Sequence, residues 1–216
     1  MKTVAIVPAY NEPKERLSSF LSRLNQYVDA IVVVDDASNS NYEFGYTVLK
    51  HKINRGQGAA LQTGTDYAMK NGADIIVHMD GDGQHKPENI PNLINPIKEK
   101  KADVVFGSKI LDKSNKIPWT KKYLIIPVAK IINYLFTGLR LTDVHNGMRA
   151  FSSSVAPKLY LTQDRMAHAS EYPYLVKMHK LRYLEVPVKV VYNEYGQGIA
   201  GGFKILKELF TAKLIK

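Results

Sequence analysis

Short runs of consecutive apolar residues recur along the first half of the chain. Four of these runs are predicted as strands: Thr3–Ala9, Ala30–Asp35, Asp74–Met79 and Asp103–Gly107. Runs without strict apolar–polar alternation are typical of strands that are buried on both faces of a parallel sheet. The second half is less regular, and there Val186–Tyr192 predicts one further strand.

Helical periodicity occupies the intervals between these runs. A first helix is predicted from apolar residues spaced three and four positions apart, namely Leu17, Phe20, Leu21, Leu24 and Val28. A second is predicted over Gln57–Asn71, and Pro87 begins a third. Two later stretches, Ile117–Leu139 and Phe203–Ile215, are predicted as helices with an apolar face and basic rims. Alternating strands and helices predict an open α/β sheet with right-handed crossovers.

Polar residues directly follow three of the predicted strands. The three clusters are Pro8–Glu12, Asp35–Ser38 and Asp80–Asp82. In open α/β sheets, ligands bind at the carboxyl ends of the strands. We therefore expect the three clusters to converge on one cleft.

The composition fits one globular domain. The 216 residues include 30 Lys and Arg against 20 Asp and Glu, which gives a net charge of +10. Such a charge attracts polyanions, but no recognition motif for nucleic acid is present, so we expect no nucleic-acid partner. Cysteine is absent, which excludes disulfides and thiolate chemistry. A membrane-spanning helix needs about 20 mostly apolar residues in succession, and the sequence has no such run. We therefore expect a cytoplasmic protein.

Asp80-Gly81-Asp82 is the first candidate for chemistry. Two carboxylates one residue apart can hold a divalent cation, whereas an isolated motif of this kind is also common in ordinary turns. A diphosphate near these acids would be repelled by about 1 kcal/mol per charge pair in water, or by roughly 4 kcal/mol at an effective dielectric near 20. The acids therefore imply either a metal ion or no diphosphate.

Four other stretches have both a functional and a structural interpretation. Asn54–Leu61 contains two glycines before a helix and is either a phosphate-approaching segment or a plain loop. Asp35-Asp36 either binds a nucleoside or caps the next helix. Asp143–Arg149 and Arg165–Glu171 lack local periodicity and, taken alone, read as ordered loops or helix faces.

Together these motifs resemble the inverting family 2 glycosyltransferases with the GT-A fold, a Rossmann-like open, mostly parallel sheet flanked by helices. The resemblance runs from Val4 to about Gly202. It rests on five motifs in the family's order: Ile6–Glu12, Val34–Ser38, Asn54–Gly64, Asp80–Glu88 and Asp143–Phe151. The fourth motif is most similar to the branch of dolichyl-phosphate mannose synthases and bacterial polyprenyl-phosphate sugar synthases.

The resemblance implies roles for individual residues. The positions that hold the donor's nucleoside match Pro8, Tyr10, Glu12 and Asp36. The positions around the diphosphate and a Mg²⁺ or Mn²⁺ ion match Asp80, Asp82 and Gln84, with Asp80 and Asp82 as metal ligands. Lys109 stands where the family usually has an arginine near the donor phosphates, and Asn54 and Gly58 are further substrate-binding candidates.

The chain departs from the family pattern at three places. Ala37 replaces the usual glycine, which we expect to be a small change. The stretch Ser38–Tyr46 is shorter than usual, which predicts an abbreviated crossover. Around Asn193 the branch often has an arginine and a following Ser-Lys pair, for which Lys189 or Lys204 are the candidate replacements.

The resemblance implies transfer of a sugar from a nucleotide-sugar donor to a polyprenyl phosphate. If the acceptor is instead a sugar hydroxyl, a carboxylate must take its proton; Asp143 is the first candidate and Glu171 the second. Arg149 either pairs with an acceptor phosphate or braces Asp143. A non-catalytic, membrane-associated subunit is the remaining alternative, whereas a sugar-1-phosphate nucleotidyltransferase would need a Gly-rich basic loop in place of Pro8–Glu12.

The lipid acceptor suggests a peripheral location on the inner face of the membrane. We divide the chain into a catalytic domain, residues 1–202, and a C-terminal amphipathic basic helix, residues 203–216. Lysines beside apolar faces favour binding to an anionic membrane surface, although both faces can equally pack on the domain. A small membrane protein is a further expected partner.

Overall fold

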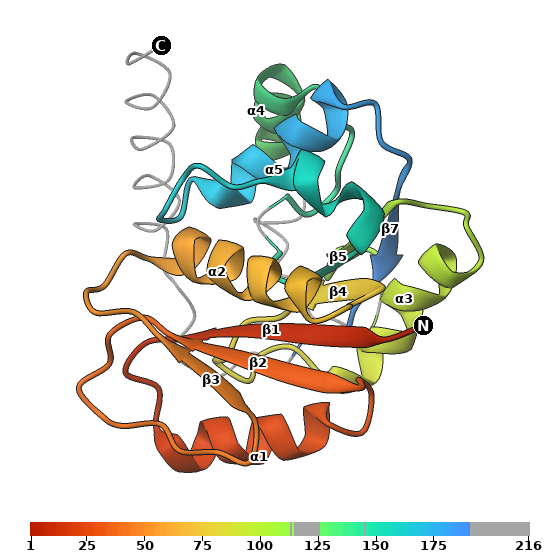
Figure 1. The fold of residues 1–216 in the computed structure, drawn as a ribbon. Helices are drawn as coiled ribbons and strands as arrows, with labels where there is room; N and C mark the ends of the chain where they lie inside the picture. The colour runs from red at the N-terminus through yellow and green to blue at the C-terminus, as the bar shows by residue number, and fades with distance from the viewer. Residues whose placement is uncertain (113, 115–125, 145, 191–216) are drawn as a thin grey trace.

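A computed structural model describes residues 1–112, 114, 126–144 and 146–190. Its described part contains one seven-stranded sheet with the order β3-β2-β1-β4-β6-β5-β7 (Figure 1). The strands are β1 (Thr3–Ala9), β2 (Ala30–Asp35), β3 (Thr47–Lys50), β4 (Ile75–His78), β5 (Val104–Ser108), β6 (Arg149–Ser152) and β7 (Tyr183–Pro187). Neighbouring strands are parallel except at β6, which is antiparallel to both β4 and β5. This is the open, mostly parallel sheet that the apolar runs predict.

Helices cover both faces of the sheet. They are α1 (Lys14–Leu24), α2 (Gln57–Lys70), α3 (Ile90–Lys98), α4 (Ile126–Thr137) and α5 (His168–Met178), with the 3-10 turns η1 (Pro87–Asn89) and η3 (Ser153–Leu159). One core cluster joins the sheet to α1 and α3, and a second joins its other face to α2 and α5. Along β1, Val4 and Ile6 belong to the second cluster and Ala5 and Val7 to the first, because successive side chains point to opposite faces.

The predicted elements agree with the structure where the apolar pattern is strong. The first four runs are β1, β2, β4 and β5. The predicted strand Val186–Tyr192 overlaps β7 only at its end, and residues 191 and 192 lie outside the described part. Strands β3 and β6 were not predicted, since each has only four residues and β6 begins at a polar residue, Arg149.

The later helix predictions are only partly covered by the structure. The C-terminal part of the predicted helix Ile117–Leu139 is α4, and residues 117–125 lie outside the described part. Residues 203–216 also lie outside it, so the boundary at 202 stays a prediction. Among the described helices, none combines the length and apolar character needed to span a bilayer.

The connection from β2 to β3 contains no helix, as the short Ser38–Tyr46 stretch predicts. Aromatic side chains replace the helix on one face. Tyr42 and Phe44 stack with ring centroids 5.6 Å apart, and both pack against the cluster that contains α1. The sheet therefore keeps a closed core at this edge despite the abbreviated crossover.

Candidate active site

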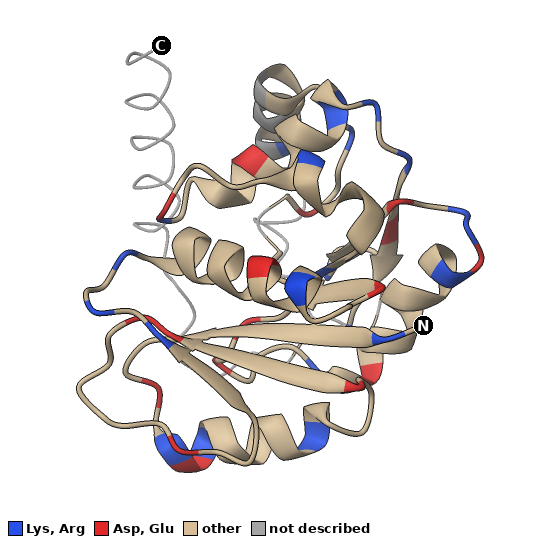
Figure 2. Ribbon diagram, in the orientation of Figure 1, with Lys and Arg blue, Asp and Glu red and all other residues tan. Residues whose placement is uncertain are grey.

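The strand order brings the predicted polar clusters together. Strands β2, β1 and β4 are adjacent and parallel, so their carboxyl ends meet at one edge of the sheet. Figure 2 shows acidic residues where these strands end. The segments that follow β1 and β2 are also hydrogen-bonded to each other at this edge. The Asp36 amide donates to the Ala9 carbonyl at 2.9 Å, and the Asn11 amide donates to Ser38 Oγ at 2.9 Å. The three clusters therefore lie at one edge of the sheet, as expected from the sequence; a single cleft shared by all three stays a prediction.

The end of β1 and the segment that follows it contain three of the residues predicted to hold the nucleoside. Pro8 is half-buried, and its carbonyl lies beside Gly81, where an added Cβ would be 3.0 Å away. Tyr10 is 51% exposed, so about half of its surface is accessible at this edge of the sheet. Glu12 forms an ion pair with Arg16, one turn into α1, and its carbonyl accepts a hydrogen bond from the Tyr42 hydroxyl.

Asp36 is buried and organises the segment that precedes α2. Its carboxylate accepts hydrogen bonds from His51 Nδ1 at 2.7 Å, from the Arg55 amide at 2.9 Å and from the Gly56 amide at 2.6 Å. Asn54 Nδ2 donates to the Asp36 carbonyl at 3.2 Å. Asp36 and Asn54 therefore lie together at this edge. His51 was missed by the sequence analysis, because nothing local marks a lone histidine after a short strand.

Gly56, directly before α2, and Gly58, in its first turn, both pack closely against protein backbone. A Cβ on Gly58 would lie 2.0 Å from the Gln163 carbonyl oxygen, and one on Gly56 would lie 2.7 Å from that of Asp164. The Ala59 amide donates to the Asp164 carbonyl at 3.0 Å. The glycine pattern thus serves close packing of the segment before α5, and a donor contact at Gly58 stays a prediction.

Asp80 lies at the centre of the site, with its side chain 26% exposed. Gln57, the first residue of α2, donates through Nε2 to Asp80 Oδ1 at 2.5 Å. His85 Nε2 lies 4.0 Å from Asp80 Oδ2. His85 is buried, which lowers its pKa, and its Nδ1 has no hydrogen-bond partner among the described residues. Gln57 was not among the predicted site residues, although it lies inside a motif that the sequence analysis identified.

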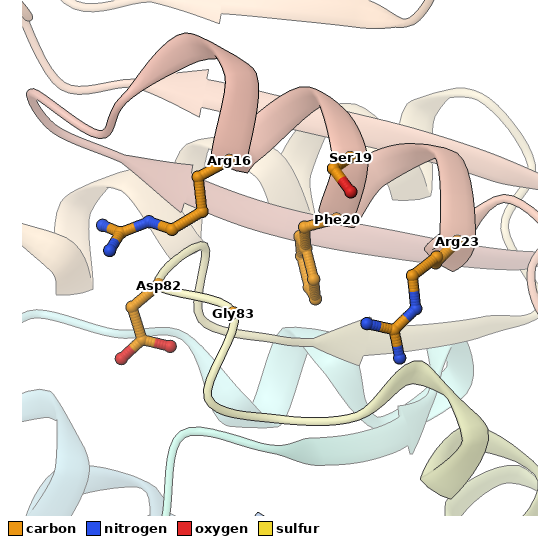
Figure 3. Close-up of a pocket in the computed structure, with 6 residues that line it drawn as sticks. All are labelled: Arg16, Ser19, Phe20, Arg23, Asp82 and Gly83. Carbon is orange, nitrogen blue, oxygen red and sulfur yellow. The ribbon is translucent and has the colours of Figure 1, made fainter. Parts of the chain in front are cut away.

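Asp82 lies in a pocket next to α1. Burial raises the pKa of Asp82, and the neighbouring Asp80 and Glu12 carboxylates act in the same direction, against a hydrogen bond from the Gln84 amide. Figure 3 shows the pocket, of about 200 Å³, which is lined by Arg16, Ser19, Phe20, Arg23, Asp82 and Gly83. Asp82 and Gly83 therefore form the wall of this pocket that faces α1.

The donor set at this loop fits a hard divalent cation only in part. Asp80 and Asp82 offer carboxylate oxygens, and the pKa of Asp82 is raised first by burial and then by the Asp80 and Glu12 charges, which a cation would offset. Within the described ranges, no three or more His, Cys, Asp or Glu side chains are grouped to hold a metal ion. An ion here would take its remaining ligands from a diphosphate and water, as Mg²⁺ commonly does.

Asp143 is connected to Lys109 across the site. Asp143 is 8% exposed and accepts hydrogen bonds from the Lys109 amide at 3.1 Å and from Asn146 Nδ2 at 3.0 Å. The Lys109 ammonium lies 3.4 Å from the same carboxylate. Glu185 of β7 accepts from the amides of Thr142 and Asp143, and burial raises its pKa. The Asp143 carboxylate is thus held in place and positions Lys109.

Arg149 lies in the core rather than at the surface of the site. It is 1% exposed, and its guanidinium stacks 4.5 Å from the centroid of the Tyr172 ring. Nη2 donates to the Asn146 carbonyl at 3.2 Å, and burial lowers its pKa. This burial leaves little surface for an acceptor phosphate. Asn146 connects Arg149 to Asp143, and both predicted roles of Arg149, bracing Asp143 and pairing with an acceptor phosphate, stay predictions.

Glu171 lies in the first turn of α5 and holds the preceding segment. Its carboxylate accepts hydrogen bonds from the amides of Thr162 and Gln163, both at 3.0 Å, and from Thr162 Oγ1 at 2.5 Å. Both oxygens are therefore engaged with protein. A role for Glu171 as a general base stays a prediction.

The chain is similar in sequence to a known protein family and to individual members of it. The model of the family described as Glycosyl transferase family 2 matches residues 4–159. The UDP-N-acetylglucosamine–dolichyl-phosphate N-acetylglucosaminyltransferase of Methanococcus voltae is 34% identical, over 98% of this chain and 96% of that protein. The undecaprenyl-phosphate mannosyltransferase of Micrococcus luteus is 29% identical, over 94% of this chain and 88% of that protein.

A solved structure has the same fold. The glucosyl-3-phosphoglycerate synthase of Mycobacterium tuberculosis, in complex with Mn²⁺, uridine diphosphate and glucosyl-3-phosphoglycerate, superposes with a TM-score of 0.71. The alignment covers 99% of this chain and 78% of that one, at 15% identity. At this identity the similarity establishes the architecture of the sheet and its helices.

Proposed function

The chain belongs to glycosyltransferase family 2, and on this basis we propose that it transfers a sugar from a nucleotide-sugar donor to a polyprenyl phosphate, with inversion at the anomeric carbon. The observation that carries the proposal is the position of Asp80 and Asp82 at the end of β4, beside the ends of β1 and β2. Two relatives named as transferases for dolichyl or undecaprenyl phosphate match nearly the whole chain, which supports the acceptor class.

The donor end of the proposed site has one aromatic ring for stacking on the nucleoside and several polar groups for binding the rest of the donor. We assign the nucleoside to the edge formed by Tyr10 and Asp36, whose side chains are respectively half-exposed and fixed by hydrogen bonds. Asp82, with Asp80, would hold a Mg²⁺ or Mn²⁺ ion, which neutralises charge on the leaving nucleoside diphosphate. Gln84 lies on the same loop, beside the diphosphate in this arrangement.

The acceptor end supplies positive charge. A phosphate oxygen of the acceptor attacks the anomeric carbon, the bond to the diphosphate oxygen breaks, and the electron pair leaves with the nucleoside diphosphate. A lipid phosphate is already an anion, so no proton has to be removed. Lys109, 37% exposed and 3.4 Å from Asp143, is the residue we assign to the phosphates. Asp143 then positions Lys109 and does not act as a base.

A helix surface supports contact with a membrane. On α4, Val128, Ile131 and Leu135 are 56%, 62% and 73% exposed. The sequence of α4, Ile126–Thr137, contains no Asp or Glu and one lysine, Lys130. An exposed apolar face without negative charge fits the interface of an anionic leaflet. We therefore propose that α4 brings the active site to its lipid acceptor, while the predicted small membrane protein and the inner-face location stay predictions.

A donor screen tests the proposed reaction. Release of nucleoside diphosphate is measured for UDP- and GDP-sugars, with or without Mg²⁺ or Mn²⁺, and with or without polyprenyl phosphate. We expect release that requires both the metal ion and the lipid phosphate. Release that depends on a sugar hydroxyl acceptor, with lipid phosphate inactive, would instead make Asp143 the candidate base. A folded chain that releases nothing under any condition would support the non-catalytic alternative.

A further inference from the structure

We propose that Gly147 and Gln57 are positioning residues that hold the Asp80 carboxylate, and that this arrangement, the Asp80 clamp, sets the affinity for the divalent cation. The inference rests on the proposed function, because it assumes that Asp80 and Asp82 hold a cation against a nucleoside diphosphate. Neither residue was predicted from the sequence to position Asp80.

Gly147 lies so close to Asp80 that any side chain at position 147 would displace the Asp80 carboxylate. A Cβ built on Gly147 would lie 1.9 Å from Asp80 Oδ2, 2.4 Å from Cγ and 2.5 Å from Oδ1. This Cβ would overlap all three atoms of the Asp80 carboxylate, so the carboxylate packs directly against the Cα of Gly147. The backbone at Gly147 is not in the left-handed region. Close approach, and not backbone conformation, is therefore the reason for glycine here.

The turn that carries Gly147 is fixed from several sides. Asn146 donates through Nδ2 to Asp143 at 3.0 Å, and its Oδ1 accepts from the Met148 amide at 2.9 Å. Its carbonyl accepts from the buried Arg149 guanidinium at 3.2 Å. Because the buried Arg149 and Asp143 resist displacement, a side chain added at 147 must be accommodated by movement of Asp80.

Gln57 restrains the same carboxylate from α2. Its Nε2 donates to Asp80 Oδ1 at 2.5 Å, so this oxygen has a fixed direction. With Gly147 against the carboxylate and Gln57 on one oxygen, rotation of Asp80 about its side-chain bonds is restricted. A ligand that is already oriented binds a metal ion without an ordering cost, and loss of such supporting contacts typically weakens metal affinity by about 10–100-fold.

The test measures cation binding without turnover. Binding of Mn²⁺ is followed by electron paramagnetic resonance in the presence of UDP or GDP, for the native protein and for Gly147→Ala. We expect about 10–100-fold weaker Mn²⁺ binding in the variant. Gly45→Ala is the matched control, because a Cβ there meets nothing within 4 Å; its Mn²⁺ affinity should equal that of the native protein.

A second control separates overpacking from the effect on Asp80. A Cβ on Gly107 would lie 2.9 Å from a Val188 methyl and 3.0 Å from the Met148 carbonyl oxygen, and none of its three nearest atoms belongs to Asp80. Gly107→Ala should therefore lower the unfolding temperature while leaving Mn²⁺ affinity unchanged. An equal loss of Mn²⁺ affinity in Gly107→Ala and Gly147→Ala would assign the effect to general strain and overturn the inference.

Gln57→Leu tests the clamp without adding volume at the turn. It removes the hydrogen bond to Asp80 and carries the test if Gly147→Ala does not fold. We expect weaker Mn²⁺ binding and an unchanged circular dichroism spectrum. Native affinity in folded Gln57→Leu and Gly147→Ala would overturn the clamp alone. Failure of the native protein to bind Mn²⁺ with either nucleotide would overturn the proposed function, and the clamp with it.

Discussion

At the scale of single residues, the backbone conformation at position 37 shows what one departure from the family pattern costs. Ala37, expected to be a small change from glycine, has φ 64°. A left-handed conformation costs an L-residue about 1–2 kcal/mol, whereas glycine adopts it freely. The substitution is thus chemically small but places strain at the start of the β2–β3 connection.

We expect Ala37→Gly to stabilise the protein. Relief of the strain exceeds the added entropy of glycine in the unfolded chain, so the gain should be about 0.5–1 kcal/mol. Thermal unfolding should show a rise of roughly 1–4 °C. Ala68→Gly in α2, where the backbone is helical, is the control and should lower the transition. A lower transition for Ala37→Gly would contradict the strain argument.

The metal assignment is also tested at one residue. Asp82→Asn keeps the size of the side chain but removes the charge that would hold the cation. We expect nucleoside diphosphate release to fall by about 100-fold or more. Asp74→Asn is the matched control, since Asp74 precedes β4 at the opposite edge of the sheet and its side chain is 52% exposed. Unchanged metal-dependent release by Asp82→Asn would refute the assignment.

At the scale of elements, a buried histidine links the sheet to two helices. His78 of β4 bonds through Nε2 to Thr65 Oγ1 of α2 at 2.9 Å and through Nδ1 to the Tyr172 hydroxyl of α5 at 3.2 Å. Burial lowers its pKa well below the usual 6.5, and the positive charges of Arg149 and His168 act in the same direction. His78 is therefore neutral in the folded protein.

This burial makes stability depend on pH. The unfolded chain takes up a proton at His78 below about pH 6.5 and the folded protein does not, so stability falls as pH falls through this range. Between pH 7.5 and 5.5 we expect a loss of about 1.4 kcal/mol from His78, measured by urea unfolding. His85, whose pKa is also lowered, adds a loss of the same sign. In His78→Gln, the loss of unfolding free energy between pH 7.5 and 5.5 should be smaller by the amount that His78 contributes. A loss as large as that of the native protein would exclude His78 as its source.

At the scale of the whole molecule, the proposed membrane contact depends on one surface. Helix α4 packs beside α5 (Figure 1), and Tyr174 and Met178 of α5 are also half-exposed. Arg140 lies 5.6 Å from the Tyr134 ring centroid at the end of this surface. In the proposed contact, the net charge of +10 would provide long-range attraction to an anionic bilayer, and the apolar side chains would then enter it.

We expect the double variant Ile131→Glu/Leu135→Glu to lose binding to vesicles that contain phosphatidylglycerol. Burial of one such side chain contributes about 1.5–3 kcal/mol, so sedimented protein should fall at least about tenfold. Ile53→Glu, at a residue 70% exposed between β3 and α2, is the control and should bind normally. Binding should also weaken as salt is raised. Equal binding by the double variant and the native protein would exclude α4 as the contact.

The sequence by itself determined the main strands and the edge at which the polar clusters lie. Burial on both faces of a parallel strand imposes a continuous apolar run, and ligands bind at carboxyl ends, so both features are visible in local patterns. Strong runs such as Ala30–Asp35 were predicted with the observed bounds. The order of the five motifs was sufficient to indicate the family.

Only the tertiary structure decided which side chains and backbone segments lie next to one another at the site. Gly147 and Gln57 contact Asp80 from distant parts of the chain, Gly58 packs on a backbone carbonyl, and Arg149 is buried. Strand β6 joins the sheet in the antiparallel sense, although its four residues carry no strong strand pattern. These contacts join residues far apart in the sequence, and their geometry depends on close packing that no local pattern records.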